Sequence, residues 1–284
     1  MEPILFTGMH RSGTSLIGRL ADAMGLFSGK SKDINEESLF FLQINIWLLD
    51  QCGSRWDNPE PIKDLWYVDE ALELAERRVR SLFRSPRSIS YLGLRNYLHH
   101  KSVSSIDMPW GWKDPRNTYT LKFWRRMFPT TKIVFIERHG VDVAASLRDR
   151  ARKTLTRAQN RPAITTGIVW PFREIPRLLD SPRCYRLEGG LELWAEYQRH
   201  AASVIKSLPP DRALCLRYED LLENPLPHIR ALSEFCSLNA GADKLEALTR
   251  SINAGRADVY RNTPELQDFA QRNRKMLEEF SYSV

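Results

Sequence analysis

Short apolar runs recur along the chain and are separated by longer stretches with helical spacing. The runs PILFTG (3–8) and TKIVFIERHG (131–140) each end in glycine, as is typical of buried strands that lead into turns. ALCLRYEDL (213–221) predicts a strand that runs into a turn. MPWGWKDPRN (108–117), with two prolines and a glycine, predicts a short strand that delivers a loop.

Apolar residues at helical spacing fill the stretches between these strands. After the first strand, Leu16, Leu20, Ala23 and Met24 form one such stripe. Residues 160–190, rich in Pro, Arg and Gly, are predicted to be irregular. The alternation of strands and helices predicts an α/β fold of three layers, α/β/α, with a central, mainly parallel sheet. Helices are predicted over residues 15–26, 36–50, 65–84, 118–127, 141–159 and 191–208, and over the rest of the chain after residue 221.

The composition fits one such domain. The chain has 284 residues, 42% of them hydrophobic, without repeats or a clear linker, so a single domain over residues 1–284 is expected. Its four cysteines are far apart and form no C-x-x-C pair, which argues against a zinc site and favours reduced thiols. The sequence contains no apolar stretch as long as a membrane span and no secretory pattern at its start. We therefore expect a cytoplasmic protein.

The charge balance narrows the class of partner. The net charge is +7 and the isoelectric point is about 9.3. Such an excess predicts either a solvated basic surface or a partner that carries phosphate or sulfate. Charge alone does not separate a nucleotide from a polyanion or a nucleic acid, so the choice depends on the motifs.

The segment GMHRSGTS (8–15) lies between the first strand and its helix. It nearly matches the phosphate-binding pattern G-x-x-x-x-G-K-[ST], except that Thr14 stands at the lysine position. The backbone N–H groups of residues 11–15 and the start of the helix form a nest for an oxyanion, and Arg11 supplies a permanent cation. The alternative is an ordinary tight turn between a strand and a helix.

The missing lysine changes the chemistry expected at this loop. ATP and GTP hydrolysis use that lysine together with a metal ion that bridges the terminal phosphates. No aspartate-rich apolar strand offers a place for Mg²⁺. The loop is therefore expected to hold a phosphate or sulfate oxyanion, and no metal site is predicted.

A second junction of strand and helix carries basic and hydroxyl side chains. Arg138 ends the strand, and Ser146 and Arg150 follow it by eight and twelve residues. From the strand end and the first helical turns, these side chains can converge on one phosphate. The alternative for Arg138 is a loop ion pair, whereas Arg152 and Arg157 are expected on a solvated face of the helix.

Four motifs resemble those of the sulfotransferase superfamily, follow one another along the chain in that family's order, and span residues 4–225. GMHRSGTSLIGRL is similar to its 5′-phosphosulfate loop and IERHGVDVAASL to its 3′-phosphate motif. WGWKDPRN resembles a further block of members with an arginine in the loop, such as tyrosylprotein sulfotransferases and bacterial sulfotransferase-like proteins. LRYEDLLENP resembles the late block of the family that carries a tyrosine. The resemblance implies in-line transfer of a sulfuryl group from 3′-phosphoadenosine 5′-phosphosulfate (PAPS) to an acceptor hydroxyl or amine, leaving 3′-phosphoadenosine 5′-phosphate (PAP).

The resemblance also implies roles for residues of this chain. Lys113 would stabilise the transferring group and the leaving phosphate. Tyr218 would lie near the adenosine, its alternative being a buried tyrosine with a satisfied hydroxyl. Asp114 is expected in a structural salt bridge, and Trp110 and Trp112 in the core or a pocket wall. The 5′-phosphosulfate would be held by Arg11, Ser12, Gly13, Thr14 and Ser15, and the 3′-phosphate by Arg138, Ser146 and Arg150.

Three residues are candidates for the general base that takes the proton of the acceptor. The bacterial members carry an acid eight residues before an asparagine, and Glu37 and Asn45 have that spacing. Glu37 is therefore preferred to Glu36 and to His10, which lies inside the loop. The glycine-containing approach seen in relatives is replaced here by SKDIN (31–35). Both glutamates are equally explained as ordinary acids at a helix N-terminus.

Two other functions fit the same motifs. A P-loop kinase of small molecules would share the loop but use the lysine that is missing here. A non-catalytic protein of the same fold would bind a nucleotide or polyanion without transfer. The acceptor pocket is expected in residues 52–107 and 154–190, which do not distinguish a saccharide, lipid, peptide or small molecule. Nucleic acid is not an expected partner, and the oligomeric state stays open.

Overall fold

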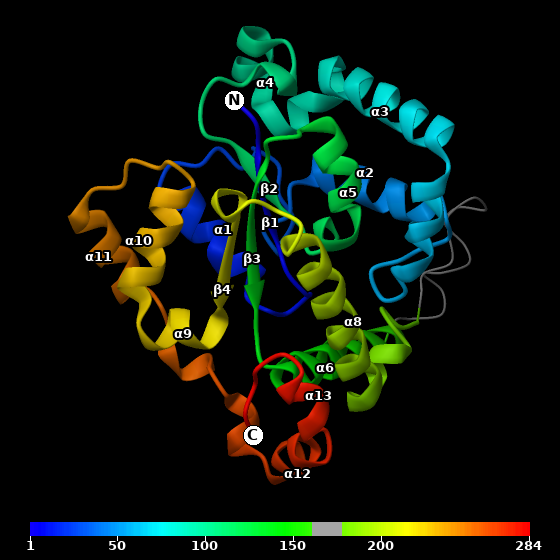
Figure 1. The fold of residues 1–284 in the computed structure, drawn as a ribbon, viewed down its shortest axis with the longest axis vertical. Coiled ribbons are helices and arrows are strands. Elements are labelled where there is room, and N and C mark those ends of the chain that lie inside the picture. Colours follow the sequence, from blue (N-terminus) through cyan, green and yellow to red (C-terminus); the bar gives the residue numbers. More distant parts are fainter. Residues whose placement is uncertain (161–177) are drawn as a thin grey trace. The chain divides into compact units, whose positions relative to one another are not determined.

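The structure is a computed structural model that describes residues 1–160 and 178–284 (Figure 1). The described residues divide into two compact units. Unit 1 comprises Met1–Arg138 and Tyr197–Asp258, and unit 2 comprises His139–Glu196 and Val259–Val284. The single domain expected from the sequence stays a prediction. Of the expected acceptor segment 154–190, residues 161–177 lie outside the described residues.

The sheet belongs to unit 1, and within the described residues it is parallel throughout. The strand order is β2-β1-β3-β4, and Ile4 of β1 pairs with Gly111 of β2 on one side and with Lys132 of β3 on the other. This sheet confirms the predicted fold class. The strands are β1 (Ile4–Thr7), β2 (Gly111–Lys113), β3 (Lys132–Glu137) and β4 (Ala213–Arg217).

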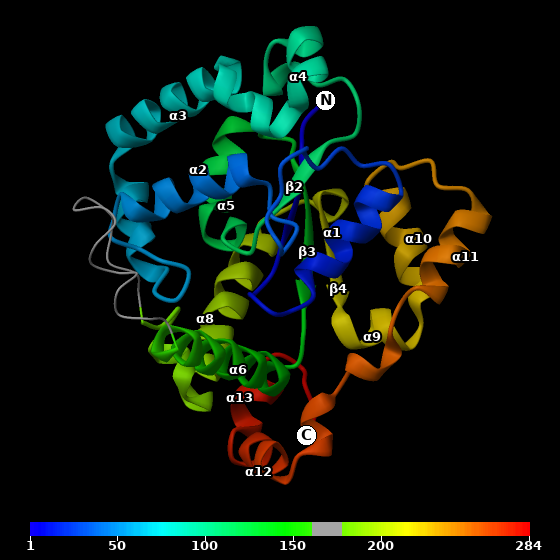
Figure 2. The same ribbon diagram turned by 180° about the vertical axis from the view of Figure 1, so that it is seen from behind.

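Helices cover both faces of this sheet, as Figures 1 and 2 show for unit 1. Strand side chains alternate between the faces: Leu5 and Ile133 belong to one apolar cluster, and Phe6 and Val134 to the other. The first cluster is completed by α2 (Leu39–Asp50), α3 (Asp69–Arg84), α4 (Ile89–His100) and α5 (Asn117–Met127). The second is completed by α1 (Thr14–Ala23), α9 (Tyr218–Glu223), α10 (Pro225–Phe235) and α11 (Ala242–Arg250).

The strand order fixes where a ligand can bind. β1 lies between β2 and β3, so the chain leaves β1 toward one edge of the sheet and leaves β3 toward the other. In open parallel sheets, such a switch point creates a crevice at the carboxyl ends of the two strands. Here those ends carry Gly8 and Arg138, which begin the two motifs singled out in the sequence.

An aromatic cluster holds β2 in place. The rings of Phe41 on α2 and Trp112 on β2 stack with centroids 3.7 Å apart and planes 2° from parallel. Trp110, Trp112 and Trp124 are completely buried. Trp110 and Trp112 are therefore core residues, which agrees with the sequence analysis.

Several helix boundaries differ from those predicted, each for a local reason. The helix expected from residue 36 begins at Leu39, because the Asp33 carboxylate accepts hydrogen bonds from the N–H groups of Asn35 and Glu37 and closes a tight loop. Helix α4 was not predicted, since Gly93 at φ +73° kinks it and interrupts its periodicity. The helix expected from residue 191 is α8 (Leu187–Ile205), which begins inside the stretch predicted to be irregular.

Unit 2 contains α6 (Gly140–Gln159), α12 (Pro264–Arg272) and α13 (Arg274–Glu278). Its C-terminal stretch is tied to the start of α6, because the Asp142 carboxylate accepts hydrogen bonds from the backbone N–H groups of Val259 and Tyr260. The His139 and Tyr260 rings stack with centroids 4.2 Å apart. Across all described residues, the helices are too short or too polar to cross a bilayer.

The stacked pair in the core gives the first testable prediction. Replacing Phe41 by alanine should lower the free energy of unfolding by about 3–5 kcal/mol, because it removes a fully buried ring and leaves a cavity. Leu74→Ala on α3 is the control; this side chain is 57% exposed, so its loss should stay within about 0.5 kcal/mol. Urea unfolding measures both, and equal losses would contradict the core position of Phe41.

Candidate active site

The loop between β1 and α1 requires glycine at its two motif positions. Gly8 has φ +146° and Gly13 has φ +95°, in the region that L-residues rarely adopt. A Cβ atom at Gly8 would overlap the carbonyl oxygen of Ile136, and one at Gly13 would overlap the ring of Tyr218. The glycines thus allow the loop to lie against β3 and α9.

The residues between the glycines are arranged as an anion site would need. Arg11 is exposed and has φ +72°, a strained value for a residue with a side chain. Ser12 is completely buried, and its Oγ has no hydrogen-bond partner among the residues that the structure describes. The N–H groups of Thr14 and Ser15 belong to the first turn of α1, where intrahelical acceptors are lacking. The Ser15 hydroxyl donates to the carbonyl of Asn35 at 2.8 Å.

Arg138 lies at the end of β3, close to the same loop. Its guanidinium donates to the backbone carbonyls of Arg11 at 3.4 Å and of Arg256 at 3.0 Å. It also lies over the ring of Tyr218, 4.8 Å from the centroid. Tyr218 therefore supports both Gly13 and Arg138, a contact that the motif comparison did not anticipate.

Lys113 and Glu37 meet in the interior of unit 1, although 76 residues separate them in sequence. The Lys113 ammonium donates to Glu37 Oε1 at 3.2 Å, and the Arg116 guanidinium donates to Glu37 Oε2 at 3.0 Å. Glu37 and Lys113 are 4% and 3% exposed. Lys113 also pairs with Phe6 across the sheet, which brings it beside the start of the glycine loop.

Asp114 links this pair of cations to the core. Its Oδ1 accepts from the Arg116 guanidinium at 2.9 Å, and its Oδ2 accepts from the Asn45 amide at 2.8 Å. The Asn45 amide oxygen in turn accepts from Thr120 and from the Trp124 indole. We call Glu37, Lys113, Asp114 and Arg116 the buried charge cluster.

The charges of this cluster act on Glu37 in opposite directions. Burial raises the pKa of the Glu37 carboxyl, and the nearby Asp114 raises it further. Lys113 and Arg116 lower the same pKa, and Asp33 adds a small upward effect. The balance raises the pKa above the usual value of a glutamate, a direction that suits a base working near neutral pH.

The other two base candidates lie elsewhere in unit 1. The Glu36 carboxylate lies 3.7 Å from the Lys32 ammonium, and its backbone has φ +66°. The His10 ring is buried and packs 4.8 Å from Trp56 and 6.3 Å from Tyr197, measured between centroids. Among the three, Glu37 is the one in hydrogen-bond contact with Lys113.

Ser146 and Arg150 lie in unit 2, on α6, one helical turn apart on the same face. The Arg150 guanidinium forms an ion pair with Asp180 at 2.6 Å. Between them on α6, Arg148 pairs with Glu265 and is largely buried. The 3′-phosphate role of Ser146, from the motif, and of Arg150, from its spacing along the helix, stays a prediction.

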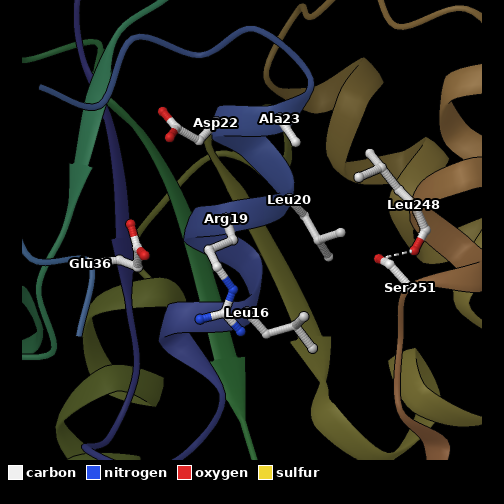
Figure 3. A pocket seen from close by; sticks show the side chains of 8 residues that line it. All are labelled: Leu16, Arg19, Leu20, Asp22, Ala23, Glu36, Leu248 and Ser251. Carbon is white, nitrogen blue, oxygen red and sulfur yellow. Dashed lines mark hydrogen bonds between the residues drawn. The ribbon is translucent and has the colours of Figure 1, made fainter. Parts of the chain in front are cut away.

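A cavity of about 500 Å³ lies along α1, and Figure 3 shows the side chains that line it. Leu20 of α1 and Leu248 of α11 point toward each other across it, and Leu16 directly follows the last residue of the glycine loop. Arg19, Asp22, Ala23, Glu36 and Ser251 complete the lining. The cavity is apolar in its middle and polar at its margins.

The sequence analysis left two contributors without a role. Arg116 belongs to the quoted motif WGWKDPRN, and its spacing of three from Lys113 was the available indication. Asn45 entered only as a spacing marker for Glu37, yet its amide is completely buried and holds Asp114. Both roles depend on side-chain contacts of the loop after β2, with Glu37 before α2 and with Asn45 on α2.

The sequence was compared with protein families and with curated proteins. A sequence model of the Sulfotransferase family matches residues 3–241, which is most of the chain. Among curated proteins, none matches the chain. The family match covers β1 through α10 and therefore includes the glycine loop, the buried charge cluster and Arg138.

Solved structures with a similar fold were also found. The sulfotransferase domain of the olefin synthase from Synechococcus PCC 7002 is 17% identical, with a TM-score of 0.50, and the match covers 100% of this chain and 96% of that one. A sulfotransferase domain from the curacin biosynthetic pathway is 15% identical, with a TM-score of 0.49 and coverage of 96% and 97%. A sulfotransferase from Alicyclobacillus acidocaldarius is 14% identical, with a TM-score of 0.47 and coverage of 100% and 97%. At 17% identity, the first likeness shows the fold alone.

The close approach of Gly13 to Tyr218 can be tested by substitution. Gly13→Ala should destabilise the protein at least about 1 kcal/mol more than Gly25→Ala, because a methyl group must be forced against a buried ring. Gly25 is a matched control, since its φ is +108° but a Cβ there would meet nothing within 4 Å. Thermal unfolding measures both variants; equal losses would show that backbone strain alone, and not the ring contact, requires glycine at position 13.

Proposed function

This chain belongs to the sulfotransferase family, and we propose that it transfers a sulfuryl group from PAPS to an acceptor hydroxyl or amine. One observation carries the proposal: the Lys113 ammonium and the Glu37 carboxylate meet at 3.2 Å beside the start of a glycine loop suited to an oxyanion. A cation, a buried base and an anion nest are the three parts that sulfuryl transfer needs.

The loop fits the 5′-phosphosulfate end of such a donor. The buried Ser12 hydroxyl lacks a partner among the described residues, and the N-terminal N–H groups of α1 point toward the same loop. The glycines leave room for an oxyanion to approach the backbone. The residues proposed to hold it are Arg11, Ser12, Gly13, Thr14 and Ser15.

The remainder of the donor has two proposed contacts. The adenosine would lie near Tyr218, whose ring lies against Gly13 of the loop and beneath the Arg138 guanidinium. The 3′-phosphate would bind Arg138, together with Ser146 and Arg150 from the motif. The support for Arg138 is its guanidinium at the end of β3, anchored to the Arg11 carbonyl.

When bound, PAPS supplies an electrophilic sulfur whose bond to the 5′-phosphate oxygen breaks as the acceptor oxygen or nitrogen bonds to it. The Lys113 ammonium would stabilise the negative charge that develops on the departing phosphate oxygen. The Glu37 carboxylate would take the proton that the acceptor loses. Arg11 would balance the charge of the sulfuryl oxygens. The products are a sulfated acceptor and PAP, with the proton on Glu37.

The role of Glu37 determines how transfer should depend on pH. A base works in its deprotonated form, so the rate should rise as the pH rises through the pKa of Glu37. Because burial raises this pKa, the rise should lie at higher pH than for an ordinary glutamate. The profile of the Glu37→Gln variant should be flat and low.

Calorimetry tests the donor site directly. PAP should bind in the low micromolar range or tighter, with the same affinity in EDTA as in Mg²⁺. A titration without measurable binding in either buffer would overturn the proposal. Binding without transfer to any acceptor would instead favour a non-catalytic protein of the same fold.

The role proposed for Arg138 predicts selectivity between two nucleotides. Arg138→Ala should weaken PAP binding by about 10- to 100-fold, because it removes charged hydrogen bonds to the 3′-phosphate. Binding of adenosine 5′-phosphate, which lacks that group, should change less than about two-fold. Arg84→Ala, an exposed arginine on α3, is the matched control. Equal losses for both nucleotides would contradict the assignment.

The role proposed for Lys113 predicts a large effect on the rate of transfer and a small effect on PAP affinity. Acceptors are first found with PAPS labelled in its sulfuryl group and panels of saccharides, lipids, peptides and small molecules. Lys113→Ala should then slow transfer by roughly 100-fold or more, because charge on the leaving oxygen loses its partner. PAP affinity should fall by less than about ten-fold. Lys122→Ala, an exposed lysine on α5, should transfer normally.

A further inference from the structure

The carboxylate of Glu37 is held by two cations with different tasks. Lys113 contacts Oε1 and, in the proposed function, also serves the donor. Arg116 contacts Oε2 at 3.0 Å and lies on the loop after β2. If the Lys113 ammonium binds the donor, as proposed, Arg116 is the cation that still contacts the Glu37 carboxylate.

Arg116 is itself fixed by a second carboxylate. One nitrogen of its guanidinium, Nη1, donates to Glu37 Oε2 and also to Asp114 Oδ1 at 2.9 Å. The Arg116 backbone N–H donates to the same Asp114 oxygen at 2.9 Å. Asp114 is 1% exposed and cannot turn away, since its other oxygen accepts from the Asn45 amide. The guanidinium is therefore held in one place, and it holds Glu37 in one place.

Asn45 extends this restraint to two helices. Its amide nitrogen donates to Asp114 and to Asn117, and its oxygen accepts from Thr120 and from Trp124. Both hydrogen atoms and the oxygen of the amide are thus used. The orientation of Asp114 is consequently set by α2 and α5, and not by the exposed surface.

From this geometry we infer that Arg116 and Asp114 are positioning residues, which act through Glu37 to set the orientation and the protonation state of the proposed base. The inference rests on the proposed function for its catalytic meaning. Its physical content, a pair of opposite charges that tune one buried carboxyl group, does not depend on the donor or the acceptor.

Arg116 and Asp114 should shift the pKa of Glu37 in opposite directions. The charged groups that face its carboxyl are Lys113 and Arg116, which lower its pKa, and Asp114 and Asp33, which raise it, while burial also raises it. A cation at hydrogen-bond distance typically lowers the pKa of a carboxyl group by about one to three pH units. Removing Arg116 alone should raise the pKa of Glu37, and neutralising Asp114 alone should lower it.

The experiment follows the Glu37 carboxyl by NMR of protein labelled with ¹³C at the glutamate side-chain carboxyl, with Glu37→Gln to assign the resonance. Arg116→Gln should raise the pKa of Glu37 by about one unit or more. Asp114→Asn should lower it, and Arg116→Lys should restore much of the original value. Circular dichroism and the unfolding midpoint establish that each variant is folded; should Arg116→Gln fail to fold, Arg116→Met removes the same charge with a side chain of similar length, and the sign of its shift is compared with that of Asp114→Asn.

The pKa of Glu37 and the affinity for PAP test the inference and the proposed function separately. Shifts of the same sign in Arg116→Gln and Asp114→Asn, or shifts below about 0.3 units, would overturn the inference, because purely structural roles predict no opposition. In the same preparations PAP should bind within about three-fold of the unchanged protein, since neither side chain is proposed to touch the donor. Opposite shifts with no PAP binding in the unchanged protein would leave the tuning intact and overturn the proposed function alone.

Discussion

The need to neutralise the buried carboxylate of Glu37 organises much of unit 1. An ionised group with 4% exposure is stable only when it is paired and hydrogen-bonded, and two cations, Lys113 at the end of β2 and Arg116 in the loop after it, meet that need. Those cations add charge of their own, which Asp114 balances, and Asp114 in turn requires the Asn45 amide. Glu37 is thus connected through Arg116, Asp114 and Asn45 to Trp124 of the core. Replacing any one of these residues alone would leave a buried polar group of its neighbour without a partner.

The sheet topology explains why this cluster and the glycine loop are neighbours. Both begin at carboxyl ends of adjacent strands, since Phe6 of β1 pairs with Lys113 of β2. The loop that carries Glu37 is fastened to the same region, because the Ser15 hydroxyl donates to the Asn35 carbonyl. Asp33 gives that loop its shape by accepting the N–H groups of Asn35 and Glu37. Glu37, the proposed base, and the glycine loop are consequently connected through short hydrogen bonds.

The sequence predicts the fold well where the pattern is local, and the site only in part. β1 and β3 were found because their apolar runs are continuous and end at turns, whereas α4 was missed because Gly93 shifts its periodicity. Family resemblance brought Lys113 and Glu37 to attention, but no spacing shows that residues 76 apart touch. The contacts of Arg116 with Glu37 and of Asn45 with Asp114 could not be predicted for the same reason. Such contacts depend on how helices pack on the sheet, and periodicity does not encode that.

The side chains of β2 alternate between the two faces of the sheet, and this links core packing to the position of Lys113. Trp112 belongs to the apolar layer of α2–α5, while Lys113, the next residue, lies against α1 near Gly18. A substitution in the aromatic layer that displaces β2 also displaces the lysine ammonium, so packing and chemistry are inherited together at this strand. Phe41, Trp112 and Lys113 therefore form a unit in which a change in packing is also a change in the position of the lysine.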